Sequence, residues 1–132
     1  MTERLTVSNR LENLKLLQDY IARWARERGF SQNRINALKM VAGKIFRHLV
    51  NQAYEPDQPG SITVSLDEKG ARVRLMFEDD APPYNPTSLN TKPPAGANVS
   101  SPPLVDLQQL ADSLIYYRTA DRKNRLVLFF TP

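Results

Sequence analysis

The apolar residues of this 132-residue chain change their spacing near residue 60, and this change constrains the fold more than any other feature. Before it, two segments carry apolar side chains three or four positions apart, which predicts two amphipathic helices. After it, apolar and polar residues alternate, which predicts strands that bury one face. The chain is therefore expected to fold as an α/β (α+β) two-layer sandwich, with a mixed, mainly antiparallel sheet and the helices on one face.

Two segments in the first half of the chain carry the helical pattern. The first helix is expected to begin at Asn9, which can cap the next turn while Glu12 takes the reciprocal position of a capping box. Gly29 suits the residue just past the end of this helix, and Ser31 is expected to open the second helix. The apolar positions are Leu11, Leu14, Leu17, Ile21 and Trp24 in the first helix, and Ile35, Leu38, Val41, Ala42, Ile45, Leu49 and Ala53 in the second. Because the link between them is short, the two helices are expected to be antiparallel neighbours.

Five segments are expected to form strands. The first covers residues 3–8, which are rich in residues that favour strands. A β-hairpin follows, with alternating residues over 61–66 and 73–77 on either side of a polar turn. The last two strands are expected at about 113–119 and 123–131.

A proline-rich segment separates the hairpin from the last two strands. Residues 82–103 hold seven of the ten prolines of the chain. Proline removes a backbone donor and fixes φ, so this segment is expected to be a long surface loop rather than a helix or a central strand. A short helix is expected over 104–112. The length of the chain is that of one domain, so residues 1–132 are expected to fold as a single unit.

The composition excludes several classes of site. The chain has no cysteine, which excludes a disulfide framework, a thiol nucleophile and thiolate-ligated metals. It has one histidine, His48, so a site with several histidine ligands is excluded as well. No apolar stretch is long enough to span a membrane, and the charged N-terminus has no signal-peptide core, so a cytoplasmic location and no membrane partner are expected. The net charge of +4 permits an anionic partner but does not require one.

Three runs of sequence are similar, in their order and spacing, to segments of the anti-sigma-factor serine kinases. They are VAGKIFRHLVNQAY at 41–54, FEDDAPPYNP at 77–86 and LVDLQQLADSLIYYRTADRKNRLVLFF at 104–130. That family belongs to the GHKL group of histidine-kinase-like ATPases. The resemblance covers nearly the whole chain and implies the fold of that group, also called the Bergerat fold.

The first of these runs departs from the family at the residues that carry the chemistry. In the family, the second helix presents a glutamate that acts as a base, an asparagine that holds magnesium and a histidine, at steps of four residues. This chain has Lys44, His48 and Gln52 at those positions. Lysine cannot replace a carboxylate, and imidazole is a poor ligand for a hard cation that prefers oxygen. We therefore expect no catalytic residue and no metal site.

The other two runs concern the nucleotide. In the family, an Asp-x-Gly motif binds adenine, with the aspartate accepting a hydrogen bond from the amino group. Asp79 is retained here and Ala81 replaces the glycine, so a residual adenine pocket at these two residues stays open. Ser101, Pro102 and Pro103 stand where a Gly-Leu-Gly turn would bind phosphates through backbone N–H groups. Since proline has no N–H, the phosphate site is expected to be lost.

Ordinary structural roles compete with these assignments. A lone histidine such as His48 is more often packed than a ligand, and the acidic pair Asp79 and Asp80 can simply form a turn. The two predicted helices carry nine basic and three acidic residues between positions 10 and 47. That excess of six makes a nucleic-acid surface conceivable, but no recognition motif accompanies it, so nucleic acid is not the expected partner.

The resemblance implies a regulatory protein-binding module without kinase activity, that is, a pseudokinase in transcription regulation. Its expected partner is a sigma factor or a STAS-type anti-sigma-factor antagonist, and its expected assembly is the homodimer common in that family. No cofactor is expected. The alternative is a divergent serine/threonine protein kinase that binds ATP and magnesium and phosphorylates the antagonist.

Overall fold

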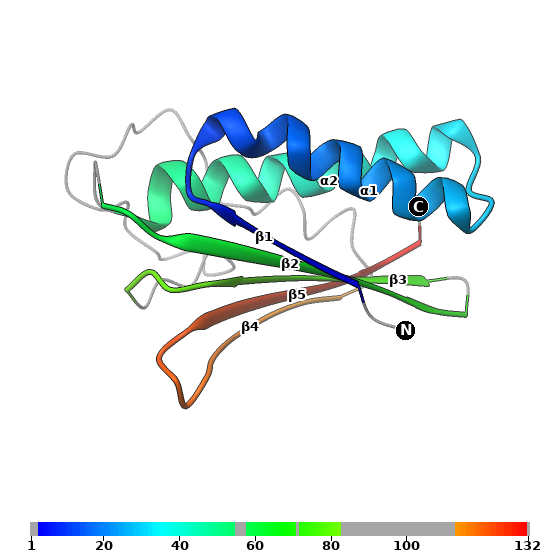
Figure 1. Cartoon of the computed structure of the whole chain (residues 1–132). Coiled ribbons are helices and arrows are strands. Elements are labelled where there is room, and N and C mark those ends of the chain that lie inside the picture. Colours follow the sequence, from blue (N-terminus) through cyan, green and yellow to red (C-terminus); the bar gives the residue numbers. More distant parts are fainter. Residues whose placement is uncertain (1–2, 55–57, 71, 83–112, 132) are drawn as a thin grey trace.

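A computed structural model of the chain describes residues 3–54, 58–70, 72–82 and 113–131 (Figure 1). In chain order the elements are β1 (Glu3–Ser8), the short 3-10 helix η1 (Leu11–Asn13), α1 (Leu14–Glu27), α2 (Gln32–His48), the π-helical turn η2 (Leu49–Ala53), β2 (Ser61–Lys69), β3 (Arg72–Asp79), β4 (Ser113–Arg118) and β5 (Asn124–Phe130). The predicted helical pair and the five predicted strands are all present.

The five strands form one sheet in the order β1-β2-β3-β5-β4. Each of the four pairings between described strands is antiparallel, so this part of the sheet is antiparallel rather than mixed. Both α-helices lie on the same side of the sheet (Figure 1). The predicted two-layer α+β architecture, with helices on one face, is confirmed.

The apolar patterns explain how the two layers join. In α1 the buried residues are Leu17, Ile21, Ala22, Trp24 and Ala25, and in α2 they include Ile35, Leu38, Val41, Ala42, Ile45 and Phe46. On the sheet, Ile62, Val64, Leu66, Val73, Leu75, Phe77, Leu126 and Leu128 are buried with them in one core. Side chains alternate across a strand, so these residues form the face that contacts the helices. Burial of this apolar surface is the main force that holds helices and sheet together.

The predicted start of the first helix is wrong. Asn9 does not cap it, because the chain first makes η1 and the α-helix begins at Leu14. The Asn9 side chain instead accepts from the Gly60 amide at 3.0 Å and donates to the Gln58 carbonyl at 2.9 Å. Asn9 therefore joins the end of β1 to the segment before β2. Its neighbour Leu11, predicted to join the apolar stripe, is exposed.

The link between the helices follows the prediction. Gly29 has a φ of +77°, the left-handed conformation expected just past a helix end. Ser31 caps α2 by accepting from the Arg34 amide at 3.3 Å.

Two predicted segments fall largely or wholly outside the described residues. These are the proline-rich loop at 82–103, of which Pro82 alone is described, and the short helix at 104–112. Single-domain folding of residues 1–132 stays a prediction. Among the described residues, no helix combines the length and apolar character that a membrane crossing requires.

Candidate functional site

Asp79 lies at the end of the central strand β3, on the side of the sheet that faces the helices. The strand register places it in one row with Ile62 of β2, Asn124 of β5 and Arg118 of β4. The Asp79 side chain is 4% exposed. A carboxylate this deeply buried needs hydrogen-bond donors, because burial of an unpaired charge is costly.

Asn124 supplies the main donor. Its Nδ2 lies 2.8 Å from Asp79 Oδ1, and the Ala81 backbone amide donates to the same oxygen at 3.0 Å. Asn124 Nδ2 also donates to the carbonyls of Ala81 and Pro82, each at 3.1 Å. One asparagine therefore joins the Asp79 carboxylate to the chain that follows β3.

The other end of the Asn124 amide is fixed as well. Its Oδ1 accepts from the hydroxyl of Tyr116 and from Arg118 Nη1, the latter at 3.0 Å. Arg118 Nη1 also donates to the Ala81 carbonyl at 3.1 Å. Fully connected networks of this kind are rigid, and each buried group depends on the others. We call Asp79, Ala81, Tyr116, Arg118 and Asn124 the Asn124 network.

The surroundings of Asp79 act on its pKa in both directions. Burial raises the pKa of this carboxyl, and the hydrogen bonds from Asn124 and Ala81 oppose that rise without cancelling it. In the described part of the chain, both hydrogen bonds to Asp79 fall on Oδ1. Oδ2 is thus the oxygen that could accept a further donor.

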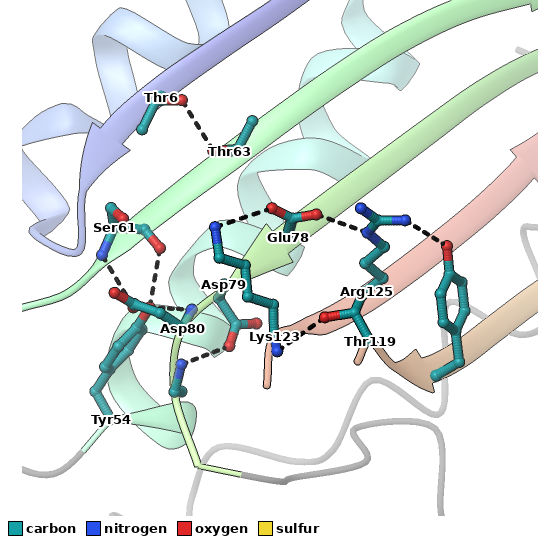
Figure 2. Close-up of polar contacts among 12 residues, drawn as sticks. Thr6, Tyr54, Ser61, Thr63, Glu78, Asp79, Asp80, Thr119, Lys123 and Arg125 are labelled. Atoms are coloured by element: carbon teal, nitrogen blue, oxygen red, sulfur yellow. Dashed lines mark hydrogen bonds and ion pairs between the residues drawn. The ribbon is translucent and has the colours of Figure 1, made fainter. Parts of the chain in front are cut away.

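Asp80, the next residue, belongs to a separate set of contacts (Figure 2). Its Oδ1 accepts from the Tyr54 hydroxyl at 2.6 Å and from the Ser61 amide at 3.1 Å. The Tyr54 hydroxyl also lies 3.1 Å from the Ser61 carbonyl. Burial and the bond to Asp80 raise the pKa of Tyr54, so this hydroxyl stays protonated and donates. These contacts fix the chain after η2 against the ends of β2 and β3.

A glycine is required beside these contacts. A Cβ on Gly60 would lie 2.2 Å from the ring of Tyr54 and 2.8 Å from Asp80 Oδ1. Only a residue without a side chain fits at this distance. We call Tyr54, Gly60, Ser61 and Asp80 the Tyr54 latch.

Helix α2 carries the other predicted site residues. Lys44 is half-buried, whereas His48 is only 6% exposed. Burial lowers the pKa of His48 from 6.5 to about 4, so its imidazole is neutral at pH 7. The α-helix ends at His48 and continues as the π-helical turn η2, which contains Gln52; the side chain of Gln52 lies outside the described residues. Turns of this type occur often at functional sites.

A family model described as the histidine kinase-like ATPase domain matches residues 7–130. The chain belongs to this family. The match begins in β1 and ends in β5, so it includes both helices, Asp79 and Asn124. A search of curated proteins found no match.

Membership of the histidine-kinase-like ATPase family confirms the GHKL group that the sequence indicated. The relation to anti-sigma-factor kinases and the roles of Lys44, His48, Gln52, Asp79 and Ala81 stay predictions. Of these residues, the structure joins Asp79 and Ala81 by a hydrogen bond. In the described part of this domain, no group of three or more histidine or acidic residues could hold a metal ion.

The sequence reasoning missed the residue at the centre of the site. Asn124 was included only as one residue of the last strand, expected at about 123–131, although a signal was present. It alternates with Leu126 and Leu128, which marks it as a polar side chain on the buried face of that strand. Tyr54 appeared only as the last residue of the run at 41–54, and its contacts to Asp80 depend on the fold.

Proposed function

We propose that this histidine-kinase-like ATPase domain is a regulatory protein-binding module of the anti-sigma-factor type that does not transfer phosphate. Its partner in this proposal is a sigma factor or a STAS-type anti-sigma-factor antagonist. One observation carries the loss of catalysis: helix α2 has no acidic residue over Gln32–His48. In the related kinases this helix supplies the carboxylate base and a magnesium ligand.

The residues at those positions do not fit magnesium and phosphate chemistry. Lys44 carries a positive charge that repels a divalent cation, and no carboxylate lies on α2 to offset it. His48 is buried and offers nitrogen rather than the oxygen that Mg²⁺ prefers. These residues therefore do not form a site for a catalytic metal.

The Asn124 network also supports the proposal, because it hinders binding of the adenine base. Asp79 Oδ1 already accepts two hydrogen bonds from within the domain. An adenine amino group would have to use Oδ2, and the Cβ of Ala81, which replaces the family's glycine, leaves less room for the base than a glycine would. A domain in this state keeps the architecture of the ATPase family and offers its outer surfaces to a protein.

The alternative, a divergent serine/threonine kinase that phosphorylates the antagonist, rests on Asp79. This carboxylate lies at the end of the central strand, and its Oδ2 accepts no hydrogen bond from the described residues, as binding of an adenine amino group requires. Under this alternative, ATP and magnesium would both bind.

Calorimetric titration of the whole chain with ATP and with ADP, each with and without Mg²⁺, separates the two functions. We expect no heat of binding at high nucleotide concentration. Magnesium-dependent binding would contradict the proposal, and mass spectrometry of an antagonist domain incubated with the protein and ATP would then test for phosphoserine.

A second experiment addresses the protein partner. Asp79→Asn removes the charge of the residual pocket and keeps its shape. We expect its affinity for a candidate sigma factor or antagonist domain to equal that of the wild type, with folding checked by circular dichroism. A large loss of affinity in a folded variant would mean that Asp79 takes part in the interaction.

A further inference from the structure

The sheet has a second face, which points away from α1 and α2 (Figure 1). We call it the open face. Because side chains alternate along each strand, the residues between the core positions belong to it. The register aligns Ser65, Met76, Val127 and Ile115 in one row across β2, β3, β5 and β4.

Met76, Val127 and Ile115 form an apolar strip across β3, β5 and β4 of the open face. Ser65, Met76 and Val127 are buried, at 1%, 7% and 5% exposed, whereas Ile115 is 49% exposed. Tyr117, two residues along β4, is 39% exposed. The apolar surface that a partner can contact is therefore at Ile115 and Tyr117, on the edge strand β4.

Basic side chains surround the strip. The strand register and the ion pairs place on the open face the basic residues Arg4, Lys69, Arg72, Arg74, Lys123 and Arg125 and the acidic residues Asp67 and Glu78. Among the described residues, this face thus has an excess of four positive charges. Such an excess attracts acidic partners and raises the rate of their association.

Several of these cations lie directly against the apolar side chains. The Arg74 guanidinium is 3.8 Å from the Met76 sulfur, and the Arg72 guanidinium carbon is 5.6 Å from the centre of the Phe129 ring. Charge and apolar surface are therefore within reach of the same bound segment.

The acidic residues of the face do not neutralise it. Glu78 pairs with Arg125 at 2.6 Å and with Lys123 at 3.5 Å (Figure 2). Partial burial raises the pKa of Glu78, but these two cations outweigh it and the net effect lowers the pKa. Glu78 thus pairs within the face, and Asp67 lies opposite Arg74 in the register. Arg72 and Arg74 lie on the other side of the strip from Glu78, and Arg4 lies at the β1 end of the same row as Met76.

We propose that the open face is a docking surface for an acidic protein segment that alternates carboxylate and aliphatic side chains. Its aliphatic side chains lie on Ile115 and Tyr117, next to the buried Met76 and Val127, and its carboxylates pair with Arg72 and Arg74. This surface is on the opposite side of the sheet from Asp79, so the proposal goes beyond the proposed function and does not depend on it.

A second copy of this chain and a single-stranded nucleic acid fit the charges and aromatic rings of the open face less well than an acidic peptide does. A second copy docked through the same face would bring two positive surfaces together, which is unfavourable. Single-stranded nucleic acid needs aromatic faces free for base stacking. Here Arg72 lies over the ring of Phe129, and Arg125 lies 5.8 Å from the centre of the Tyr117 ring and bonds its hydroxyl at 3.1 Å.

The test uses the full chain labelled with ¹⁵N and two synthetic peptides. One alternates leucine and glutamate, and the other alternates serine and glutamate. We expect the leucine peptide to shift the amide signals of Ile115, Tyr117 and the adjacent Val127, and to bind about tenfold more tightly than the serine peptide. Equal binding of the two peptides, or signal shifts confined to α1 and α2, would overturn the proposal.

Paired variants separate this face from general charge attraction. Arg72→Glu with Arg74→Glu should weaken the leucine peptide at least about tenfold. The matched control, Arg23→Glu with Arg26→Glu on exposed positions of α1, changes the net charge equally and should leave the affinity nearly unchanged. Similar losses in the two double variants would contradict the proposal.

Two further measurements test the competing occupants, and Ile115→Ser gives a folded variant if the arginine pair proves unstable. We expect this exposed substitution to weaken the leucine peptide. Sedimentation velocity that shows a dimer broken by Ile115→Ser would assign the face to a second copy. Binding of a single-stranded oligonucleotide that is lost in the Arg72/Arg74 variant would assign it to nucleic acid. Either result would overturn the proposal.

Discussion

The helix-facing end of the sheet around Asp79 and the open face differ in how their polar groups are satisfied. Around Asp79, a buried carboxylate, an amide, a hydroxyl and a guanidinium are joined in the Asn124 network. On the open face, six basic side chains face only Asp67 and Glu78 among the described residues. The first arrangement stabilises the fold and keeps one geometry, whereas the second leaves an excess of positive charge that, in our proposal, an acidic partner neutralises. This difference is why we assign partner binding to the open face and a structural role to the Asn124 network.

The largest expected effect tests the Asn124 network. Asn124→Ala removes the Nδ2 donor to Asp79 Oδ1 and the acceptor for Tyr116 and Arg118. The buried Asp79 carboxylate then loses one of its two donors, the carbonyls of Ala81 and Pro82 lose a donor each, and Tyr116 and Arg118 lose their acceptor, so we expect the free energy of unfolding to fall by about 4 kcal/mol. Urea denaturation at pH 7 measures this loss.

A double-mutant cycle with Asp79→Ala provides the control. If the two residues act through their hydrogen bond, the double variant should lose clearly less than the two single losses together. Strict additivity would show that Asn124 stabilises the domain without Asp79.

The next largest expected effect is a loss of stability in acid, and it is caused by His48 of helix α2. The pKa of His48 is about 4 in the fold and 6.5 in the unfolded chain, so the unfolded state takes up a proton first as the pH falls. Stability is therefore lost between about pH 6.5 and pH 4, by about 3 kcal/mol in total. Urea denaturation at pH 7 and pH 4 should show this loss in the wild type.

Comparison with His48→Leu isolates the histidine. The raised pKa of Asp79 acts in the opposite sense, because a carboxyl that binds its proton more tightly in the fold favours folding at low pH. Both proteins share that contribution, so the difference between their pH dependences reports His48. Parallel curves for wild type and variant would refute the assignment.

The sequence predicted the fold better than the site for a physical reason. Helix and strand patterns depend on local spacing, and the burial of Leu17, Ile21 and Leu38 follows from it. The capping role of Asn9 failed because its side chain binds the distant Gly60 amide. Such contacts across the chain are set by the sheet register, which spacing along the sequence does not determine.

The site likewise contains residues that the sequence could predict and residues that it could not. The place of Asp79 at a strand end could be predicted from the alternation of β3 and from the family resemblance. Its partner Asn124 is far along the chain, and only the β3–β5 register brings the two together. The open face shows the same limit, since Met76, Val127 and Ile115 form a row only once three strands are aligned.

A middle-sized effect is expected at the Tyr54 latch. In Gly60→Ala the new methyl group would meet the Tyr54 ring and Asp80 Oδ1, so the latch must open or the chain must shift. We expect a loss of about 2 kcal/mol of unfolding free energy, as for other overpacked sites. Thermal denaturation followed by circular dichroism measures it.

The adjacent Ser61→Ala serves as the matched control. Ser61 bonds Asp80 and Tyr54 through its backbone amide and carbonyl, and its side chain is exposed. The melting temperature of Ser61→Ala should stay close to that of the wild type. If Gly60→Ala matched Ser61→Ala, the close approach of Tyr54 would have no energetic consequence.

The smallest expected effect is on the open face and has the opposite sign. Ser65 is 1% exposed, and its hydroxyl has no hydrogen-bond partner among the described residues. Ser65→Ala removes this unsatisfied group, so we expect the free energy of unfolding to rise by about 0.5 kcal/mol. Thr63→Ala, on the same face of β2, removes a hydroxyl that lies 2.8 Å from that of Thr6 and should lower it by a similar amount. Changes of opposite sign in the free energy of unfolding, measured by urea denaturation, would show that the open face, unlike the Asn124 network, leaves a buried polar group without a hydrogen bond. A loss of stability in both variants would show that the Ser65 hydroxyl has a partner and that the two faces are alike in this respect.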